Sequence, residues 1–392
     1  MTARIVAVPG PGLDGGDAVR WGAEAGLDVE VRPGPPALVL LDLTGAGPDV
    51  TGVLLGPGPG ALDDPSLAAA VAAAAGPVVA VEPGNLRKTG PAPEDTAFTA
   101  AGGRVLYGRG ADTGRHGVLF LARRRHRRPD TLAYGAGPDQ AGDLWLPAGA
   151  GPHPVVLLLH GGFWYHAWER DLMDGLALDL AGRGLAAWNV EYRRVGAGGG
   201  WPAPAEDAGR AIEHLLALAP VYHLDLARVV VLGHSAGAQL GLWLAARGRR
   251  AEVHPALAVG LATIADLAAA RHDRIGGGSV DRLLDGAAAG PDGALADASP
   301  IARLPLGVAQ LLARADDDAV VPPAQTDRYA AAATAAGDDV TVLRLERGGH
   351  FDLIDPATAA WSSVAAELGR RLEKLRTRPG RMPPTGPTSR GS

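Results

Sequence analysis

Short apolar runs alternate with helical segments along the first part of the chain. The runs with the length and β-branched content of buried strands are residues 5–8, 29–32, 52–55 and 77–81. Residues 18–25 and 65–75 have helical patterns, whereas residues 37–43 are apolar throughout and fit a strand or a helix equally well. Strands that alternate with helices in this way predict a small parallel α/β domain.

The alternation resumes at about residue 131. Residues 134–135 and 143–147 have the pattern of two paired antiparallel strands. Further strands are predicted over residues 154–159, 185–192, 228–233, 256–261, 308–313 and 340–345, and further helices over residues 172–181, 205–218, 238–247 and 358–375. Residues from about 265 to 302 are irregular and rich in Gly and Ala, as in a cap inserted between strands. The pattern predicts a mostly parallel sheet flanked by helices.

A basic run over residues 123–128 separates the two patterns. Such a run suits either a nucleic-acid patch or a solvated linker, and the change of composition at this point favours the linker. We therefore divide the chain into a small domain over residues 1–122, a linker over residues 123–130 and a larger domain over residues 131–375. Residues 376–392 are rich in Pro, Gly and Ser and are predicted to form a disordered tail.

The composition limits the classes of partner and the kinds of chemistry that fit this protein. Its 392 residues suffice for two domains, and a hydrophobic content of 47% supports sizeable cores. A net charge of −6 argues against a general nucleic-acid binder, and the absence of cysteine excludes disulfides, thiol catalysis and cysteine metal sites. The sequence has no signal-like N-terminus and no apolar run of membrane-spanning length. We therefore expect a cytoplasmic protein with no membrane partner and no metal or other cofactor.

One stretch carries the clearest chemical signal. The β-type run Val229–Leu232 leads into Gly233-His234-Ser235-Ala236-Gly237, and a helical pattern follows. This order predicts a sharp strand-to-helix turn that exposes the Ser235 hydroxyl, and the two glycines avoid collisions with the neighbouring strand and helix. The turn places Ser235 at a helix N-terminus, where free N–H groups stabilise negative charge. In this context Gly-x-Ser-x-Gly predicts a serine nucleophile.

A second motif supplies hydrogen-bond donors for such a nucleophile. His160-Gly161-Gly162-Phe163-Trp164 directly follows a predicted strand. Two glycines let the backbone approach a substrate closely, so the amides of Gly162, Phe163 and Ala236 are the predicted oxyanion hole. A plain Gly-Gly turn is the alternative interpretation. His160 precedes the loop, and we interpret it as a structural hydrogen-bonding residue rather than a base.

The other members of a catalytic triad follow the last predicted strands. Residues 316–318 are three aspartates in a turn, and Val321-Pro322 stands at the distance that selects Asp318 as the acid. His350 lies on a glycine loop after the last predicted strand, where a base can reach Ser235. The order Ser235, Asp318, His350 is that of α/β hydrolases and differs from the chymotrypsin and subtilisin orders.

Aromatic residues gather beside the predicted oxyanion hole. Phe163, Trp164, Tyr165 and Trp168 cluster there, and Trp201 lies on a Gly-rich segment. Such aromatics could shape an apolar or aryl pocket, in which we predict that Trp164, Tyr165 and Trp201 bind substrate. Packing in the protein core explains the same side chains equally well.

Together these motifs resemble the α/β-hydrolase superfamily over residues 131–375. The resemblance is to its His-Gly-Gly esterase and kynurenine-formamidase-like branch. The segments that carry it are residues 160–164, 191–194, 233–237, 318–322 and 349–351. The resemblance implies a Ser-His-Asp triad, an acyl-enzyme and a small ester or aryl formamide as substrate. Kynurenine formamidases hydrolyse N-formylkynurenine, but related carboxylesterases and some peptidases have nearly identical loops.

The first third of the chain resembles type II 3-dehydroquinate dehydratase. The matching segments end three predicted strands, at residues 8–13, 56–62 and 80–85. Glu82 stands at the position of that family's catalytic histidine, and no tyrosine precedes Tyr107 to match its catalytic tyrosine. The resemblance implies a catalytically inactive relative that assembles into homo-oligomers. An unrelated flavodoxin-like domain is the alternative.

Two classes of function fit the sequence. The first is an active serine hydrolase of carboxylic esters or aryl formamides. The second is a metabolite-binding or regulatory protein that uses the dehydroquinase-like domain as a sensor, or that keeps a residual dehydratase activity there. The intact triad and oxyanion hole favour the hydrolase, because a scaffold requires none of these residues together.

Overall fold

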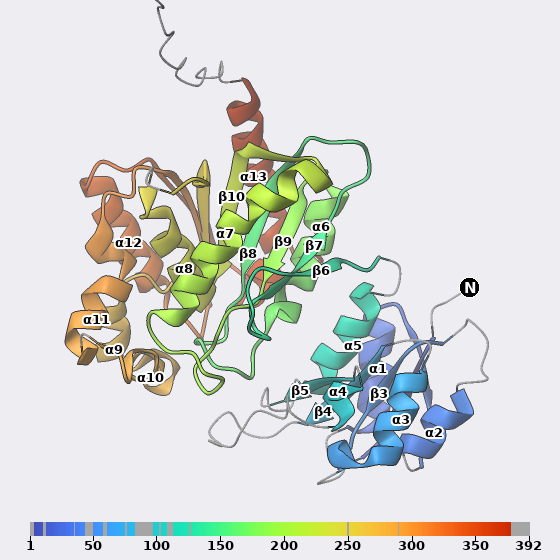
Figure 1. Ribbon diagram of the computed structural model, residues 1–392. Helices are drawn as coiled ribbons and strands as arrows, with labels where there is room; N and C mark the ends of the chain where they lie inside the picture. The colour runs from blue at the N-terminus through green and yellow to red at the C-terminus, as the bar shows by residue number, and fades with distance from the viewer. Residues whose placement is uncertain are drawn as a thin grey trace, which may run out of the picture.

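The computed structural model describes residues 4–10, 13–34, 36–43, 50–57, 61–74, 77–82, 97–101, 103–107, 113–124, 127–248, 251–288 and 290–377. Two separate sheets organise the chain (Figure 1). We call residues 4–124 the N-terminal domain and residues 130–377 the C-terminal domain. Parts of the dehydroquinase-like segments, at residues 11–12, 58–60 and 83–85, lie outside the described residues, as does the predicted tail beyond residue 377.

The N-terminal domain is a five-stranded parallel sheet with helices on both faces. Its strands are β1 (Arg4–Val8), β2 (Asp28–Val31), β3 (Val50–Leu55), β4 (Val78–Glu82) and β5 (Arg104–Tyr107), in the spatial order β2-β1-β3-β4-β5. Helices α2 (Pro36–Leu43), α3 (Pro65–Ala73) and α4 (Ala97–Ala100) cover one face, and α1 (Gly15–Glu24) and α5 (Thr113–Arg124) cover the other. This is the flavodoxin-like doubly wound order. Residues 37–43 are therefore helical, and Pro36 begins their helix, where its missing N–H costs no hydrogen bond.

The C-terminal domain is an eight-stranded, mostly parallel sheet. Its strands are β6 (Asp130–Ala133), β7 (Ala141–Trp145), β8 (His153–Leu159), β9 (Ala186–Val190), β10 (Leu224–His234), β11 (Leu257–Leu261), β12 (Ala309–Ala315) and β13 (Val340–Leu345), in the order β13-β12-β11-β10-β8-β9-β7-β6. Strand β7 pairs antiparallel with β6 and β9, and the other neighbours are parallel. The predicted antiparallel opening is present, although its first strand ends before Tyr134.

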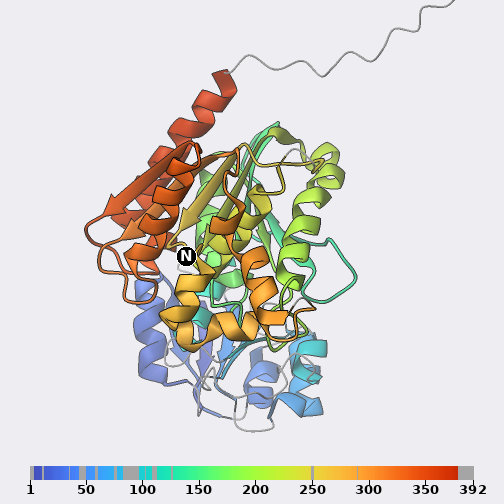
Figure 2. The same ribbon diagram turned by 90° about the vertical axis from the view of Figure 1, so that its left-hand side faces the viewer.

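Helices cover both faces of the larger sheet (Figures 1 and 2). One face carries α7 (Ala203–Tyr222), α8 (Ala236–Ala245) and α12 (Pro323–Ala335), and the other carries α6 (Asp174–Gly182) and α13 (Ala359–Thr377). The insertion between β11 and β12 contains α9 (Leu267–His272), α10 (Ser279–Leu284) and α11 (Gly290–Ala298). Arg376 and Thr377 belong to α13, so the prediction of a disordered tail from residue 376 is wrong for these two residues. No helix among the described residues is long and apolar enough to span a membrane.

Helix α5 joins the two domains. Arg124, in its last turn, donates from Nε to Asp174 Oδ2 at 2.7 Å and also pairs with Asp143. Both carboxylates are fully buried, and the Arg124 side chain is 15% exposed. The prediction of a solvated linker from residue 123 is therefore wrong for Arg124, because a basic run looks the same in sequence whether it faces water or buried acids. Arg104 of β5 makes a second cross-domain pair, with Glu169.

Candidate active site

Ser235 lies in a sharp turn between β10 and α8. Its backbone has φ +55° and ψ −118°, a conformation that L residues rarely adopt and that stores strain. A Cβ at Gly233 would lie 2.2 Å from the carbonyl oxygen of Gly237, and a Cβ at Gly237 would lie 2.1 Å from the carbonyl oxygen of Leu159. Both positions therefore require glycine, as predicted, because strand, turn and helix approach too closely for a side chain.

Asp318 and His350 form a hydrogen-bonded pair. Asp318 Oδ2 accepts a hydrogen bond from His350 Nδ1 at 2.8 Å, and Oδ1 accepts from the amides of Val320 and Val321 at 2.8 and 2.9 Å. Burial raises the pKa of Asp318, but the His350 ring and the two amides outweigh it and hold this pKa below its usual value. An ionised Asp318 keeps the proton of His350 on Nδ1 and leaves Nε2 as an acceptor.

The His350 ring lies against the residue that precedes Ser235. His234 Nε2 donates to the carbonyl oxygen of His350 at 3.0 Å, and the two ring centroids are 4.5 Å apart. Burial, with a further contribution from His350, lowers the pKa of His234 well below its usual value, so this ring is neutral. Ser235, Asp318 and His350 are 1%, 8% and 6% exposed, and the structure thus gathers the three predicted triad residues in one buried region.

The predicted oxyanion loop crosses directly in front of the serine. A Cβ on Gly161 would lie 3.1 Å from Cβ of Ser235. Gly162, Phe163 and Trp164 all have positive φ, at +109°, +53° and +62°, so the backbone turns tightly here. The Ser235 amide is bonded to the carbonyl of Leu261 at 2.8 Å. The next amide, that of Ala236, begins α8, where first-turn N–H groups have no partner within the helix.

A buried polar network supports this loop from behind. His160 Nε2 contacts Glu191 Oε1 at 2.8 Å, and His160 Nδ1 contacts the carbonyl oxygen of Gly161 at 2.7 Å. The Tyr192 hydroxyl donates to the carbonyl of His160 at 2.8 Å, and the two rings stack with centroids 4.3 Å apart. His160 is therefore a structural hydrogen-bonding residue, as predicted. Despite burial, Arg194 and His160 hold the pKa of Glu191 below its usual value, so this acid is ionised.

Comparison with known proteins identifies the larger domain. Residues 143–332 match the protein-family model BD-FAE. This region is an α/β-hydrolase esterase domain of the BD-FAE family. The protein is thus a carboxylesterase-type serine hydrolase, and we refer to it below as the esterase. A comparison with curated protein sequences found no match.

Solved structures of esterases share this fold. They include an acetyl ester-xyloside bifunctional hydrolase from Caldicellulosiruptor lactoaceticus (19% identity, TM-score 0.53, 63% of this chain and 97% of that chain). They also include esterase B from Lactobacillus rhamnosis (18%, 0.57, 68% and 93%) and carboxyl esterase 2 from Tuber melanosporum (20%, 0.52, 63% and 87%). None of these names a formamidase or a dehydroquinase, so those two resemblances stay predictions, as do the homo-oligomer and the cytoplasmic location.

The predicted substrate-binding aromatics occupy different positions in the esterase. Trp164 is 0% exposed and donates from Nε1 to Gln239 Oε1 at 3.0 Å, so it is a core residue and its predicted role is wrong. Trp201 is 5% exposed and donates to Asp297 Oδ2 at 2.8 Å, which ties the segment before α7 to the cap. It is also a packing residue. Tyr165 is half-buried and its hydroxyl accepts a hydrogen bond from Arg282 of the cap, so it remains a candidate.

Two further aromatic residues lie beside the triad, Trp168 of the predicted aromatic cluster and Phe351, which we did not predict to bind substrate. Phe351 is 44% exposed, and its ring centroid is 5.3 Å from that of His350. Trp168 stacks on Phe351 with centroids 5.8 Å apart. Its side chain also packs on the loop, because a Cβ on Gly162 would lie 2.2 Å from Trp168 Cβ. Phe351 adjoins the triad histidine in the sequence, and this adjacency was the available signal for its position.

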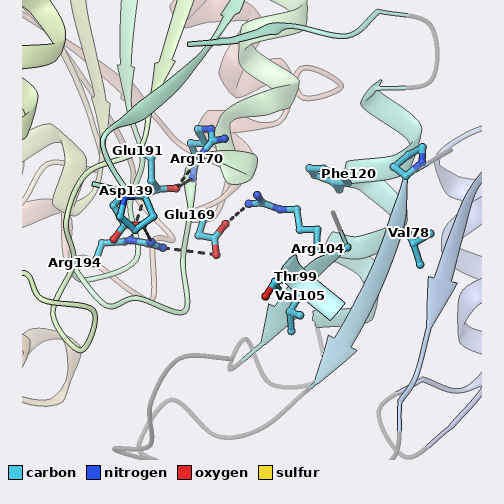
Figure 3. Close-up of a pocket in the computed structure, with 13 residues that line it drawn as sticks. Val78, Thr99, Arg104, Val105, Phe120, Asp139, Glu169, Arg170, Glu191 and Arg194 are labelled. Carbon is cyan, nitrogen blue, oxygen red and sulfur yellow. Dashed lines mark hydrogen bonds and ion pairs between the residues drawn. The ribbon is translucent and has the colours of Figure 1, made fainter. Parts of the chain in front are cut away.

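A cavity of about 420 Å³ lies between the two domains (Figure 3). Arg104 extends into it from the N-terminal domain toward Glu169, and Asp139, Glu191 and Arg194 line the opposite side. Neither Ser235 nor His350 lines this cavity, so it is not the site of the proposed reaction. Among the described residues, no group of three or more His, Asp or Glu side chains is placed to hold a metal ion.

Proposed function

We propose that the esterase hydrolyses carboxylic esters of small molecules through an acyl-enzyme on Ser235. The hydrogen bond from His350 to Asp318 carries this proposal, because it prepares a base whose ring lies against the strained serine turn. The BD-FAE match and the similarity to solved esterases support an ester as the substrate.

The proposed reaction begins with attack of Ser235 Oγ on the ester carbonyl. His350 Nε2 takes the serine proton, and Asp318 stabilises the imidazolium through the bond to Nδ1. The oxyanion accepts hydrogen bonds from the amides of Gly162, Phe163 and Ala236. His350 then protonates the leaving alkoxide, and the acyl group stays on Ser235.

Water completes the proposed cycle. His350 Nε2 removes a proton from a water molecule that attacks the acyl carbonyl, and the second oxyanion uses the same three amides. Collapse of this intermediate releases the carboxylic acid and returns the proton to Ser235. Phe163, Tyr165 and Phe351 offer partly exposed aromatic surface near these atoms for an apolar part of the substrate.

Turnover of two model substrates tests this proposal. The protein is offered p-nitrophenyl acetate and N-formylkynurenine, beside Ser235→Ala and the control Ser362→Ala. The exposed Ser362 hydroxyl donates a hydrogen bond to the carbonyl of Thr358, just before α13. We expect ester hydrolysis that falls at least about 10³-fold in Ser235→Ala and is unchanged in Ser362→Ala. Turnover of N-formylkynurenine alone would replace the esterase assignment with an arylformamidase. No turnover of either compound by folded protein would contradict a serine hydrolase acting on this class of substrate.

A further inference from the structure

The N-terminal domain reaches the active-site region through helix α5. His116 on this helix meets Trp168 of the C-terminal domain edge to face, with ring centroids 5.5 Å apart and an interplanar angle of 85°. Trp168 follows the oxyanion loop by only a few residues. The smaller domain therefore packs on a chain segment that directly follows the oxyanion loop.

Trp168 contacts both halves of the catalytic apparatus. On one side its side chain packs on the backbone of Gly162, where a Cβ would lie 2.2 Å from Trp168 Cβ. On another side its ring stacks on Phe351, whose ring meets that of His350 with centroids 5.3 Å apart. A shift of the indole would therefore disturb an oxyanion donor and the surroundings of the base at the same time.

The residues after Trp168 are also bound by the N-terminal domain. Arg104 pairs with Glu169 and lies 3.5 Å from Asp171, and Arg124 pairs with Asp174 at 2.7 Å. Asp171 and Asp174 are 2% and 0% exposed in their side chains, so these pairs are largely screened from water. Exposed ion pairs contribute little to rigidity, but buried pairs fix geometry because breaking one leaves a charge without a partner. The segment is thus held along its length.

We propose that His116 is a positioning residue of the esterase, which acts by holding Trp168 against Gly162 and Phe351. The N-terminal domain is then a part of the active site that supports the oxyanion loop. This inference rests on the proposed function, because the Gly162 amide matters only if an oxyanion forms beside it. A displacement of about 1 Å at a reacting group costs up to about 100-fold in rate. Loss of one contact on the indole is expected to cost about tenfold, since the stack on Phe351 remains.

Three variants on α5 test the inference. His116→Ala removes the ring, His116→Phe restores an aromatic edge, and Arg115→Ala is the matched control, because Arg115 pairs with Glu24 inside the N-terminal domain. The readouts are the melting temperature, kcat and KM for p-nitrophenyl acetate, and the rate of Ser235 labelling by a fluorophosphonate, in which Ser235 Oγ displaces fluoride from phosphorus. We expect His116→Ala to lower kcat and the labelling rate about tenfold with KM within about twofold, and His116→Phe to recover most of the loss. Arg115→Ala should match the wild type.

Several outcomes would overturn the inference. A folded His116→Ala that labels at the wild-type rate would do so, as would a rise of KM alone, which would make His116 a substrate contact. If His116→Ala does not fold, Trp168→Phe replaces the indole with a smaller ring and weakens the same contact from the C-terminal domain. An unchanged kcat in this variant would also overturn the inference. A wild-type protein that neither turns over the ester nor labels would instead refute the proposed function, so the two failures are distinguishable.

Discussion

Three consecutive aspartates follow β12, and their environments differ sharply. Asp316 pairs with Arg314, and Asp317 accepts a hydrogen bond from the amide of Gly348 at 3.4 Å, so both are turn residues at the surface. Asp318 turns inward, where two amides fix one oxygen and His350 contacts the other. Asp318 is also the member of the three that the spacing to Val321-Pro322 predicts as the acid.

Replacing Asp318 by asparagine should remove most of the activity without unfolding the protein. An asparagine NH₂ would donate to His350 Nδ1 and favour the tautomer that cannot accept the serine proton, so we expect kcat to fall about 10³–10⁴-fold. Asp317→Asn is the matched control and should keep kcat within about twofold. Steady-state hydrolysis of p-nitrophenyl acetate checks both variants. A larger loss in Asp317→Asn than in Asp318→Asn would contradict the assignment.

Asp139, beside the cavity between the domains, should give the folded state a characteristic pH dependence. Burial raises its pKa to about 6, although Arg194 opposes this shift. The folded state then binds a proton more tightly than the unfolded state, so stability falls as pH rises from about 4 to about 6. Wild type should lose about 2–3 kcal/mol more than Asp139→Asn between pH 4 and pH 7 in urea unfolding. Parallel pH profiles for the two proteins would show that Asp139 ionises normally.

The prediction that Trp164 binds substrate was wrong because of the backbone conformation of the loop. Neighbours of a catalytic motif are predicted to line its pocket, but positive φ at Phe163 and Trp164 turns the loop so that the Trp164 indole enters the core. Non-glycine residues rarely adopt positive φ, and no local sequence rule signals it at these two positions. The contact of Trp168 with Phe351 was not predictable either, because this stacking joins two distant parts of the chain.

At the scale of elements, the strand-turn-helix unit β10–Ser235–α8 follows almost entirely from local sequence. The apolar strand, the two glycines and the helical pattern each agree with the turn. The secondary structure of residues 37–43 was ambiguous, because a short run of apolar residues shows neither the helical nor the strand periodicity. In the folded protein these residues form helix α2, which packs on the N-terminal sheet.

Glycine substitutions test how tightly this unit is built. Gly237→Ala would place Cβ 2.1 Å from the carbonyl oxygen of Leu159, and backbone in a sheet cannot move away cheaply. We expect a loss of at least about 3 kcal/mol and of activity. Gly369→Ala in α13 meets nothing within 4 Å and should be neutral or more stable by about 0.5–1 kcal/mol. Thermal melts compare the two, and a Gly237→Ala protein as stable as wild type would contradict the described turn.

At the scale of the whole molecule, ion pairs join the two domains that contain the two sheets. The alternation of strands and helices predicted both of them, and the order of motifs predicted where the triad residues gather. The packing of α5 on the C-terminal domain was not predictable, because it depends on which acidic side chains of that domain are buried in the folded protein. Arg124 meets two such acids, Asp143 and Asp174.

Arg124→Ala should therefore destabilise the C-terminal domain, although Arg124 belongs to the N-terminal one. Removing the guanidinium leaves Asp174 buried without its ion-pair partner, which costs about 3–5 kcal/mol, while Arg170 still pairs with Asp143 at 3.0 Å. Arg115→Ala, in the same helix, should cost less than about 1 kcal/mol. Urea unfolding followed by tryptophan fluorescence measures both. Equal stability of Arg124→Ala and wild type would show that the interface does not hold in solution.

Covalent labelling by a fluorophosphonate, followed by peptide mapping, tests whether Ser235 is the nucleophile. We expect a single adduct on the peptide that contains Ser235, absent in Ser235→Ala and formed at least about 10³-fold more slowly in His350→Ala. Folded protein that forms no adduct, or forms it on another residue, would contradict a Ser235–His350–Asp318 hydrolase.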